Sequence, residues 1–248
     1  MSQRIFILGT DTDVGKTITS CALLHALQER GHRALPFKPA ASGPKDATSD
    51  TQQLIRSCRL PLQAAEVTPL HFHESLAPGV AENPAPFLNH TAQAKPNGPP
   101  DVLRQMEAHL SGLERRHRPT LTLIEGAGGL LVPMPGGSWQ DQWIDCFKAR
   151  ILLVGRAGLG TINHTLLTIE ALEKRGHNAL GFILNHGAQP QASSPQLAAQ
   201  NASMITARTK LPHFGTLPTL DHHAPWPKSD SWLHANFWSA LALQPSDP

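Results

Sequence analysis

Apolar runs alternate with helical patterns along most of the chain. Runs of four to six mostly apolar residues have the length of buried strands, and they lie at 4–8, 34–37, 121–124, 151–154, 179–184 and 214–217. Other segments repeat their apolar residues at helical spacing, and they lie at 16–29, 102–114, 162–174 and 229–241. Strands and helices that alternate at this rhythm favour right-handed crossovers. The pattern therefore predicts a three-layer α/β fold with a mainly parallel sheet and helices on both faces.

Composition narrows the class of protein. The 248 residues, 40% of them hydrophobic, are enough for one sizeable core, so we expect a single domain over 1–248. A net charge of +2 gives no sign of a nucleic-acid or membrane footprint. The three cysteines are far apart and odd in number, which is typical of reduced thiols rather than of a disulfide framework. We therefore expect a cytoplasmic protein that binds neither nucleic acids nor membranes.

The strongest chemical signal is the glycine-rich segment 9–17, between the first predicted strand and the first predicted helix. Backbone N–H groups of such a turn point inward, and the helix N-terminus adds its dipole, so that together they bind phosphate. Lys16 supplies a positive charge for the β- and γ-phosphates, and the hydroxyl of Thr17 is suited to Mg²⁺. Five residues separate Gly9 from Gly15, one more than in the standard motif. The segment predicts a variant phosphate loop that binds ATP, and hence a P-loop NTPase-like fold.

Two carboxylates are candidates for completing a magnesium site. Glu125 follows the strand predicted at 121–124, so it would lie at the carboxyl edge of the sheet, where open α/β folds bind ligands. The glycines at 126–129 would let the backbone approach a bound group closely. Asp50 stands beside the predicted start of a short helix. It is a second candidate ligand, although a carboxylate at a helix N-terminus is also explained by the helix dipole.

Lys38 is a candidate for a catalytic role. It comes directly after the second predicted strand and before Pro39, which restricts its backbone to extended conformations. A lysine positioned in this way at the carboxyl end of a strand favours charge stabilisation in the site over a plain surface role.

A third glycine cluster occupies 158–164, after the strand predicted at 151–154. It does not fit a dinucleotide fingerprint, because Asn163 stands where the third glycine belongs. Two interpretations remain open for it. The turn is either a carboxylate site at a helix N-terminus or an ordinary strand-to-helix connection.

Taken together, these segments resemble the dethiobiotin synthetase family. The similarity rests on four motifs and extends over most of the chain in the same order: G-T-D-T-D-V-G-K-T at 9–17, F-K-P-A-A-S-G at 37–43, E-G-A-G-G-L-L-V-P at 125–133 and G-L-G-T-I-N-H-T-L-L-T at 158–168. Asn185 and the segment 215–218 extend the match. The first motif alone would indicate only the wider group of amidoligases and partitioning ATPases.

The resemblance implies a three-step reaction. CO₂, supplied as bicarbonate, converts one amine of 7,8-diaminononanoate into a carbamate, which attacks the γ-phosphate of ATP. The second amine then closes the ureido ring of dethiobiotin and releases phosphate. ATP is thus a co-substrate and Mg²⁺ the cofactor, and two anions must approach each other with the help of metal and lysine charges.

The resemblance also implies the residues of each subsite. Catalytic roles fall to Lys38 and Lys16, and magnesium ligands are Thr17, Asp50 and Glu125. Contacts with ATP are implied for Asp13, Val14, Gly15, Lys16, Thr17, Asp50, Glu125, Gly126, Ala127, Gly128, Asn185, Leu217, Pro218 and Thr219. Contacts with the diamine are implied for Thr12, Ser42, Gly160, Thr161 and Asn163, with the 160–163 turn serving the partner subunit of a homodimer.

Two alternatives remain. The chain could be a P-loop switch or partitioning ATPase, but these proteins usually carry a signature lysine early in the loop, and 9–11 has none. It could also be a related ligase for a different diamine. Members of the family commonly carry a Pro-His pair where this chain has Pro78 and Gly79, and this departure keeps the second alternative open.

Overall fold

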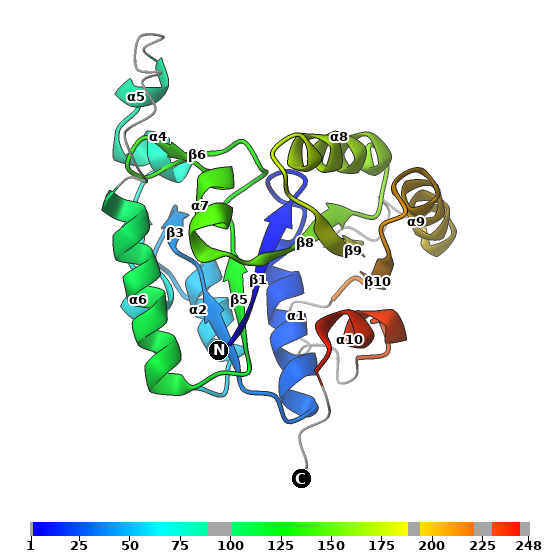
Figure 1. The fold of residues 1–248 in the computed structure, drawn as a ribbon, viewed down its shortest axis with the longest axis horizontal. Helices are drawn as coiled ribbons and strands as arrows, with labels where there is room; N and C mark the ends of the chain where they lie inside the picture. The colour runs from blue at the N-terminus through cyan, green and yellow to red at the C-terminus, as the bar shows by residue number, and fades with distance from the viewer. Residues whose placement is uncertain (1, 89–100, 188–193, 221–229, 244–248) are drawn as a thin grey trace.

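A six-stranded parallel sheet forms the centre of the protein. A computed structural model describes residues 2–88, 101–187, 194–220 and 230–243 (Figure 1). The strands are β1 (Gln3–Gly9), β2 (Ala34–Phe37), β5 (Leu121–Glu125), β8 (Arg150–Arg156), β9 (Ala179–Asn185) and β10 (His213–Leu217). Their order is β10-β9-β8-β1-β5-β2, and every pair of neighbours is parallel. The predicted sheet is therefore confirmed.

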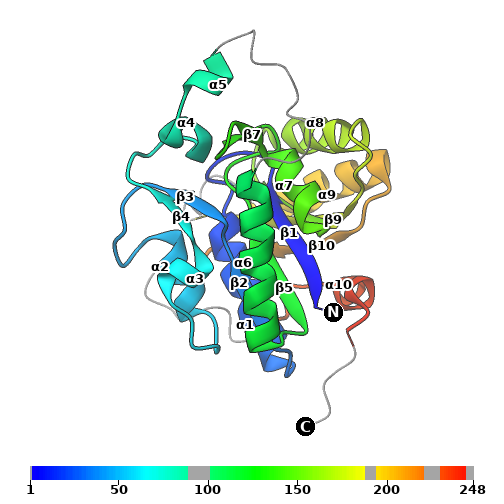
Figure 2. The ribbon, with the colours of Figure 1, turned by 60° about the vertical axis from the view of Figure 1, so that its left-hand side comes forward.

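Helices cover both faces of this sheet. They are α1 (Lys16–Glu29), α6 (Asp101–His117), α7 (Gln140–Phe147), α8 (Thr161–Glu173) and α9 (Pro195–Thr209). Because the chain moves from β1 to β2 in one direction and from β2 through β5 and β8 to β10 in the other, right-handed crossovers place α1 on one face and α6 to α9 on the other. Figures 1 and 2 show α1 behind the sheet when α6 and α7 lie in front. Strands buried on both faces explain the continuous apolar runs in the sequence.

Several short elements have too little periodicity to be predicted from the sequence. They are β3 (Ala40–Ser42), β4 (Leu70–Phe72), β6 (Pro133–Met134), β7 (Ser138–Trp139), α3 (Ala64–Val67), α4 (Pro78–Glu82) and α5 (Ala85–Leu88). The short helix that the sequence predicts beside Asp50 is present as α2 (Asp50–Arg56). β3 and β4 form a small parallel pair, and β6 and β7 form an antiparallel hairpin. Within the described ranges, no helix is long and apolar enough to cross a membrane.

The C-terminal segment covers one edge of the sheet. Leu233 bridges to Gly215 of the edge strand β10, and α10 (Ala235–Leu241) follows. The predicted helix over 229–241 is therefore shorter than expected. Arg150 at the start of β8 fixes this segment to the sheet, since it donates to the carbonyl of Ala240 at 3.0 Å. Phe237 and Leu241 are fully buried, so this segment belongs to the same apolar core as β1.

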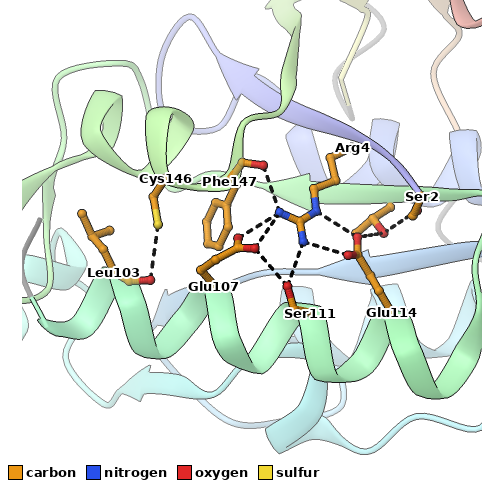
Figure 3. Close-up of polar contacts among 9 residues, drawn as sticks. Ser2, Arg4, Leu103, Glu107, Ser111, Glu114, Cys146 and Phe147 are labelled. Carbon is orange, nitrogen blue, oxygen red and sulfur yellow. Dashed lines mark hydrogen bonds and ion pairs between the residues drawn. The ribbon is translucent and has the colours of Figure 1, made fainter.

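A cluster of charges fixes the start of β1 to α6 (Figure 3). Arg4 donates to Glu107 at 2.9 Å and to Glu114 at 2.7 Å, and it also donates to the carbonyl of Phe147 at 3.1 Å. Ser111 lies between the two glutamates on α6 and donates to Glu107 at 3.0 Å. Five hydrogen-bond donors in a planar fork suit Arg4 to such a network, because each carboxylate receives its own N–H groups.

Candidate functional site

The parallel register brings the ends of three adjacent strands together. Ile7 of β1 pairs with Glu125 of β5, and Phe37 of β2 pairs with Ile124. The residue after Phe37, Lys38, therefore lies beside Glu125, and both lie next to the loop that follows Gly9. Carboxyl ends of parallel strands are where ligands bind in this class of fold.

The phosphate loop has the backbone geometry of an anion site. Asp13 and Gly15 adopt left-handed conformations, with φ of 56° and 87°, which turns the chain into the start of α1. Glycine is required at position 15, because a Cβ there would lie 1.6 Å from Nδ2 of Asn185. Nζ of Lys16 donates to the carbonyl of Asp11 at 3.1 Å. The side chain of Lys16 therefore folds over the phosphate loop and contacts its backbone at Asp11.

Lys16 is poised to respond to an anion. Burial of its ammonium, together with the positive charge of Lys38, lowers the pKa of Lys16 to about 8. Near neutral pH the ammonium of Lys16 is charged although burial disfavours that charge. The oxygens of a bound phosphate would stabilise it.

Lys38 is buried between two carboxylates. Its Nζ lies 2.7 Å from Oε1 of Glu125 and 2.9 Å from Oδ2 of Asp50. Burial by itself would lower the pKa of Lys38, but attraction to Glu125 and Asp50 outweighs burial and raises it. The hydroxyl of Thr17 donates to the same Oε1 of Glu125 at 2.7 Å. Two of the predicted magnesium ligands thus pair with one ammonium group, and the third, Thr17, is bonded to one of these two carboxylates.

The oxygen donors of this cluster suit a hard divalent cation. Mg²⁺ prefers carboxylate and hydroxyl oxygens and is usually held by one or two carboxylates plus phosphates. Oε2 of Glu125 is buried and has no hydrogen-bond partner among the described residues. Within the same residues, no group of three or more His, Cys, Asp or Glu could hold a metal. A cation here would therefore need Thr17 and phosphate oxygens beside the two carboxylates, and the residues present fit that requirement.

The loop at 126–129 packs directly on the start of the phosphate loop. A Cβ at Gly128 would lie 3.1 Å from the hydroxyl of Thr12, and one at Gly9 would lie 2.8 Å from the carbonyl oxygen of Gly128. Gln140, the first residue of α7, makes side-chain hydrogen bonds to the backbone of this loop at Ala127 and Gly129. Sequence reasoning missed Gln140, because a glutamine at the start of a helix has no distinguishing pattern.

Asn185 connects the phosphate loop to the far side of the sheet. Its Nδ2 donates to the carbonyl of Val14 at 3.2 Å, and its backbone pairs with Leu217. Beyond it lies a groove of about 790 Å³, between α9 and the C-terminal segment. The groove is lined by residues that include His186, Pro218 and Trp232. Pro218 thus lines the groove, whereas Asn185 and Leu217 are buried and adjoin its lining residues His186 and Pro218 in the chain. Thr219 follows Pro218.

Of the other predicted substrate residues, Ser42 lies beside the charge cluster and the 160–163 turn lies apart from it. Ser42 shares a smaller pocket of about 210 Å³ with Asp50 and donates to the carbonyl of Leu76 at 2.6 Å. Gly160 and Asn163 are exposed at the start of α8, while the neighbouring Thr161 is buried beneath them. Within one chain, the contacts that the structure gives the 160–163 turn do not include the phosphate loop.

Gly79 is explained by packing. A Cβ at this position would lie 2.5 to 2.7 Å from backbone atoms of Met134 in β6, so α4 could not approach the hairpin with a larger residue. The missing histidine of the Pro-His pair thus coincides with a close contact between two short elements.

Comparison with known proteins agrees with the geometry of the site. A family model described as an AAA domain matches residues 3–225. The chain is 36% identical over 223 residues to the ATP-dependent dethiobiotin synthetase BioD of Bacillus velezensis, covering 89% of this chain and 88% of that protein. It is 38% identical over 206 residues to the protein of the same name from Anaeromyxobacter sp. (strain K), covering 82% and 85%. It is 33% identical over 225 residues to the ATP-dependent dethiobiotin synthetase BioD 1 of Escherichia coli, covering 89% and 92%.

Proposed function

This chain belongs to the dethiobiotin synthetase family, and from that premise we propose that it is an ATP-dependent ligase that closes the ureido ring of dethiobiotin. Its substrates would be 7,8-diaminononanoate, CO₂ supplied as bicarbonate, and ATP, and its products dethiobiotin, ADP and phosphate. Two C–N bonds form, one per amine, and each amine loses a proton. The oxygen that leaves the carboxyl carbon departs with the phosphate.

The observation that supports this function best is the cluster of Lys38, Glu125 and Asp50. A P-loop switch needs the phosphate loop and one carboxylate, but it has no use for a buried lysine between two carboxylates. A ligase has a use for one, because a carbamate and a terminal phosphate repel each other and need positive charge between them.

On this proposal, the phosphate loop orients the nucleotide. Backbone N–H groups at Asp13, Val14 and Gly15 bind the phosphates, and Lys16 moves from the carbonyl of Asp11 to the β- and γ-phosphates. Magnesium held by Thr17, Asp50 and Glu125 would neutralise phosphate charge and help to align the terminal phosphate for attack.

Lys38 would then change partners. A divalent cation at Glu125 and Asp50 would balance the charge that Lys38 now balances, so the ammonium of Lys38 would be available to the carbamate and the phosphoryl oxygens. While Lys38 is paired with Glu125 and Asp50, their attraction raises its pKa, so the group is present as an ammonium that can stabilise negative charge and not as a base.

The nucleotide base would lie beyond Asn185. The groove between α9 and the C-terminal segment begins at His186 and Pro218, the neighbours of Asn185 and Leu217. Burial and the nearby imidazole of His234 lower the pKa of His213 in its wall to about 4, so this imidazole is neutral at physiological pH. The described lining of the groove contains aromatic and hydroxyl groups and no Asp, Glu, Lys or Arg, which suits a neutral heterocycle.

Substrate contacts are proposed in two places. Thr12 and Ser42 would bind the amine end, near the phosphate loop and Asp50. The carboxylate tail would meet the Gly160–Asn163 turn of a second subunit, where a helix N-terminus favours an anion. We accordingly propose a homodimer in which each chain, over 1–248, forms one ligase domain.

A product assay tests the function. The protein would be supplied with ATP, Mg²⁺, bicarbonate and 7,8-diaminononanoate, and dethiobiotin and phosphate would be measured together. Equal amounts of both, each dependent on the diamine, are expected. ATP hydrolysis that ignores the diamine and yields no ring product would favour a switch ATPase, and activity on another diamine alone would favour a related ligase.

A further inference from the structure

Gln140 connects α7 to the loop that follows Glu125. Its side chain is fully buried at the first position of the helix. Oε1 accepts a hydrogen bond from the backbone N–H of Ala127 at 2.6 Å, and Nε2 donates to the carbonyl of Gly129 at 2.7 Å. One amide group therefore satisfies two backbone groups of the same loop, one a donor and the other an acceptor.

The packing around this amide leaves no room for another arrangement. A Cβ on Gly126 would lie 2.8 Å from Oε1 of Gln140 and 2.7 Å from the ring of Phe6. The glycine at 126 therefore has to be there for Gln140 to reach the loop. A buried amide with both ends bonded is costly to disturb, because each broken bond leaves a backbone group without water or a partner.

The loop that Gln140 holds contacts both the Lys38–Glu125 charge cluster and the phosphate loop. Glu125 is its first residue, and Oε1 of Glu125 binds Thr17 and Lys38. Gly128 lies against Thr12 and Gly9 of the phosphate loop. A shift of this loop would therefore move the candidate metal ligand and the candidate amine contact together.

We infer that Gln140 is a positioning residue that sets the geometry of the Glu125–Gly129 loop and, through it, of the magnesium and substrate contacts. The inference rests on the proposed ligase function for its kinetic consequences. Its structural part concerns the loop alone.

One substitution at position 140 makes the hydrogen bond to the carbonyl of Gly129 depend on pH. In Gln140→Glu, a protonated carboxyl has the same shape and pattern as the amide: its carbonyl accepts from Ala127 and its O–H donates to Gly129. Burial raises the pKa of such a carboxyl. Once ionised it has no proton for the carbonyl of Gly129, and the second bond is lost. The apolar isostere Gln140→Met removes both bonds.

We expect Gln140→Glu to form product at near the wild-type rate at pH 6. At pH 9 its kcat should fall by about 10- to 100-fold relative to the wild type at the same pH, the range typical for residues that orient a metal ligand. KM for ATP should rise in the same variant, because the loop contains Glu125 and the implied ATP contacts Gly126, Ala127 and Gly128. Gln142→Met is the matched control: it is on the same helix, and its oxygen accepts from Trp139 at 2.8 Å, away from the glycine loop. It should follow the wild-type pH profile even if it melts earlier.

Amide hydrogen exchange gives a readout without turnover. In Gln140→Met the N–H of Ala127 should exchange at least tenfold faster than in the wild type, while the amides in the middle of β5 stay protected. If Gln140→Met does not fold, Gln140→Glu measured at pH 6 and pH 9 replaces it. A Gln140→Glu profile parallel to the wild type, or unchanged exchange at Ala127, would overturn the inference. A wild-type protein that makes no dethiobiotin would instead overturn the proposed function, and the exchange experiment would still decide the role of Gln140.

Discussion

β1 has a charge cluster at each end, and the two clusters differ in how completely their groups are paired. At its start, Arg4 binds Glu107 and Glu114 at 2.9 and 2.7 Å, and Ser111 and a carbonyl complete the network. At its end, Lys38 is shared by Glu125 and Asp50, and Oε2 of Glu125 has no hydrogen-bond partner among the described residues.

The difference separates a structural cluster from a functional one. The network of Arg4 is satisfied within the chain, so its role is to join β1 to α6. The cluster of Lys38 contains a buried carboxylate oxygen without a partner, and beside it the ammonium of Lys16 forms no direct ion pair among the described residues. Burial and the charge of Lys38 lower the pKa of Lys16 to about 8. Incomplete pairing of this kind is expected where a ligand supplies the missing partners.

Removing the charge of Lys38 should have the largest effect. We expect Lys38→Ala to lower kcat for dethiobiotin formation by about 100- to 1,000-fold, the cost of deleting one group that stabilises transition-state charge. ATP should still bind, because the phosphate loop is intact, and calorimetry would measure that. Lys174→Ala, an exposed lysine at the end of α8, is the control. Turnover at the wild-type rate in Lys38→Ala would reject its catalytic role.

Glu125→Gln should act mainly on the metal. The amide keeps the shape of the side chain but has no charge for Mg²⁺, so the midpoint of a magnesium titration should rise by about 10- to 100-fold. The titration is best monitored by product formation at saturating ATP. A midpoint equal to that of the wild type would show that Glu125 is not a ligand.

Arg4→Met should leave the chemistry alone and affect stability. Exposed ion pairs contribute about 0.2–1 kcal/mol and fully buried ones cost about 3–5 kcal/mol to break, and the side chain of Arg4 is 15% exposed. We therefore expect the free energy of unfolding to fall by about 1–2 kcal/mol in urea melts. kcat should match the wild type. A large loss of kcat in a folded Arg4→Met protein would mean that the two ends of β1 are coupled.

The pH dependence of nucleotide binding should be the smallest effect near neutral pH. Phosphates raise the pKa of Lys16 above its value of about 8 in the free protein, so binding above pH 8 requires uptake of a proton. Affinity for ATP should be constant below pH 8 and should fall as pH rises beyond it, by at most about tenfold per unit. Lys16→Arg, whose guanidinium stays charged, should bind more weakly but lose this step. A wild-type affinity that stays flat up to pH 10 would contradict the assignment.

The sequence predicted the central elements better than their contacts. The apolar runs and the glycine–lysine–threonine motif placed β1, α1 and β2 within a residue of their observed ends. Lys38 and Glu125 were both singled out, but their pairing depends on β2 lying next to β5, which periodicity does not encode. The short hairpin β6–β7 was missed because two-residue strands have no pattern to read.

Two features required the structure. Gly79 departs from the family pattern in sequence, and only the approach of α4 to Met134 gives the reason. Gln140 is an ordinary polar residue in the sequence, and its importance comes from a backbone donor and acceptor spaced to match one amide. Contacts between a side chain and the backbone of a loop distant in sequence depend on tertiary geometry, so local sequence patterns do not predict them.

The account depends on Lys38 exchanging the two carboxylates for the reacting anions. A crystal structure with Mg²⁺, a non-hydrolysable ATP analogue and 7,8-diaminononanoate would test this most directly. We expect the metal between Thr17 and Glu125, and Nζ of Lys38 within hydrogen-bonding distance of the terminal phosphate. Lys38 still paired with Glu125 and both far from that phosphate would contradict the account.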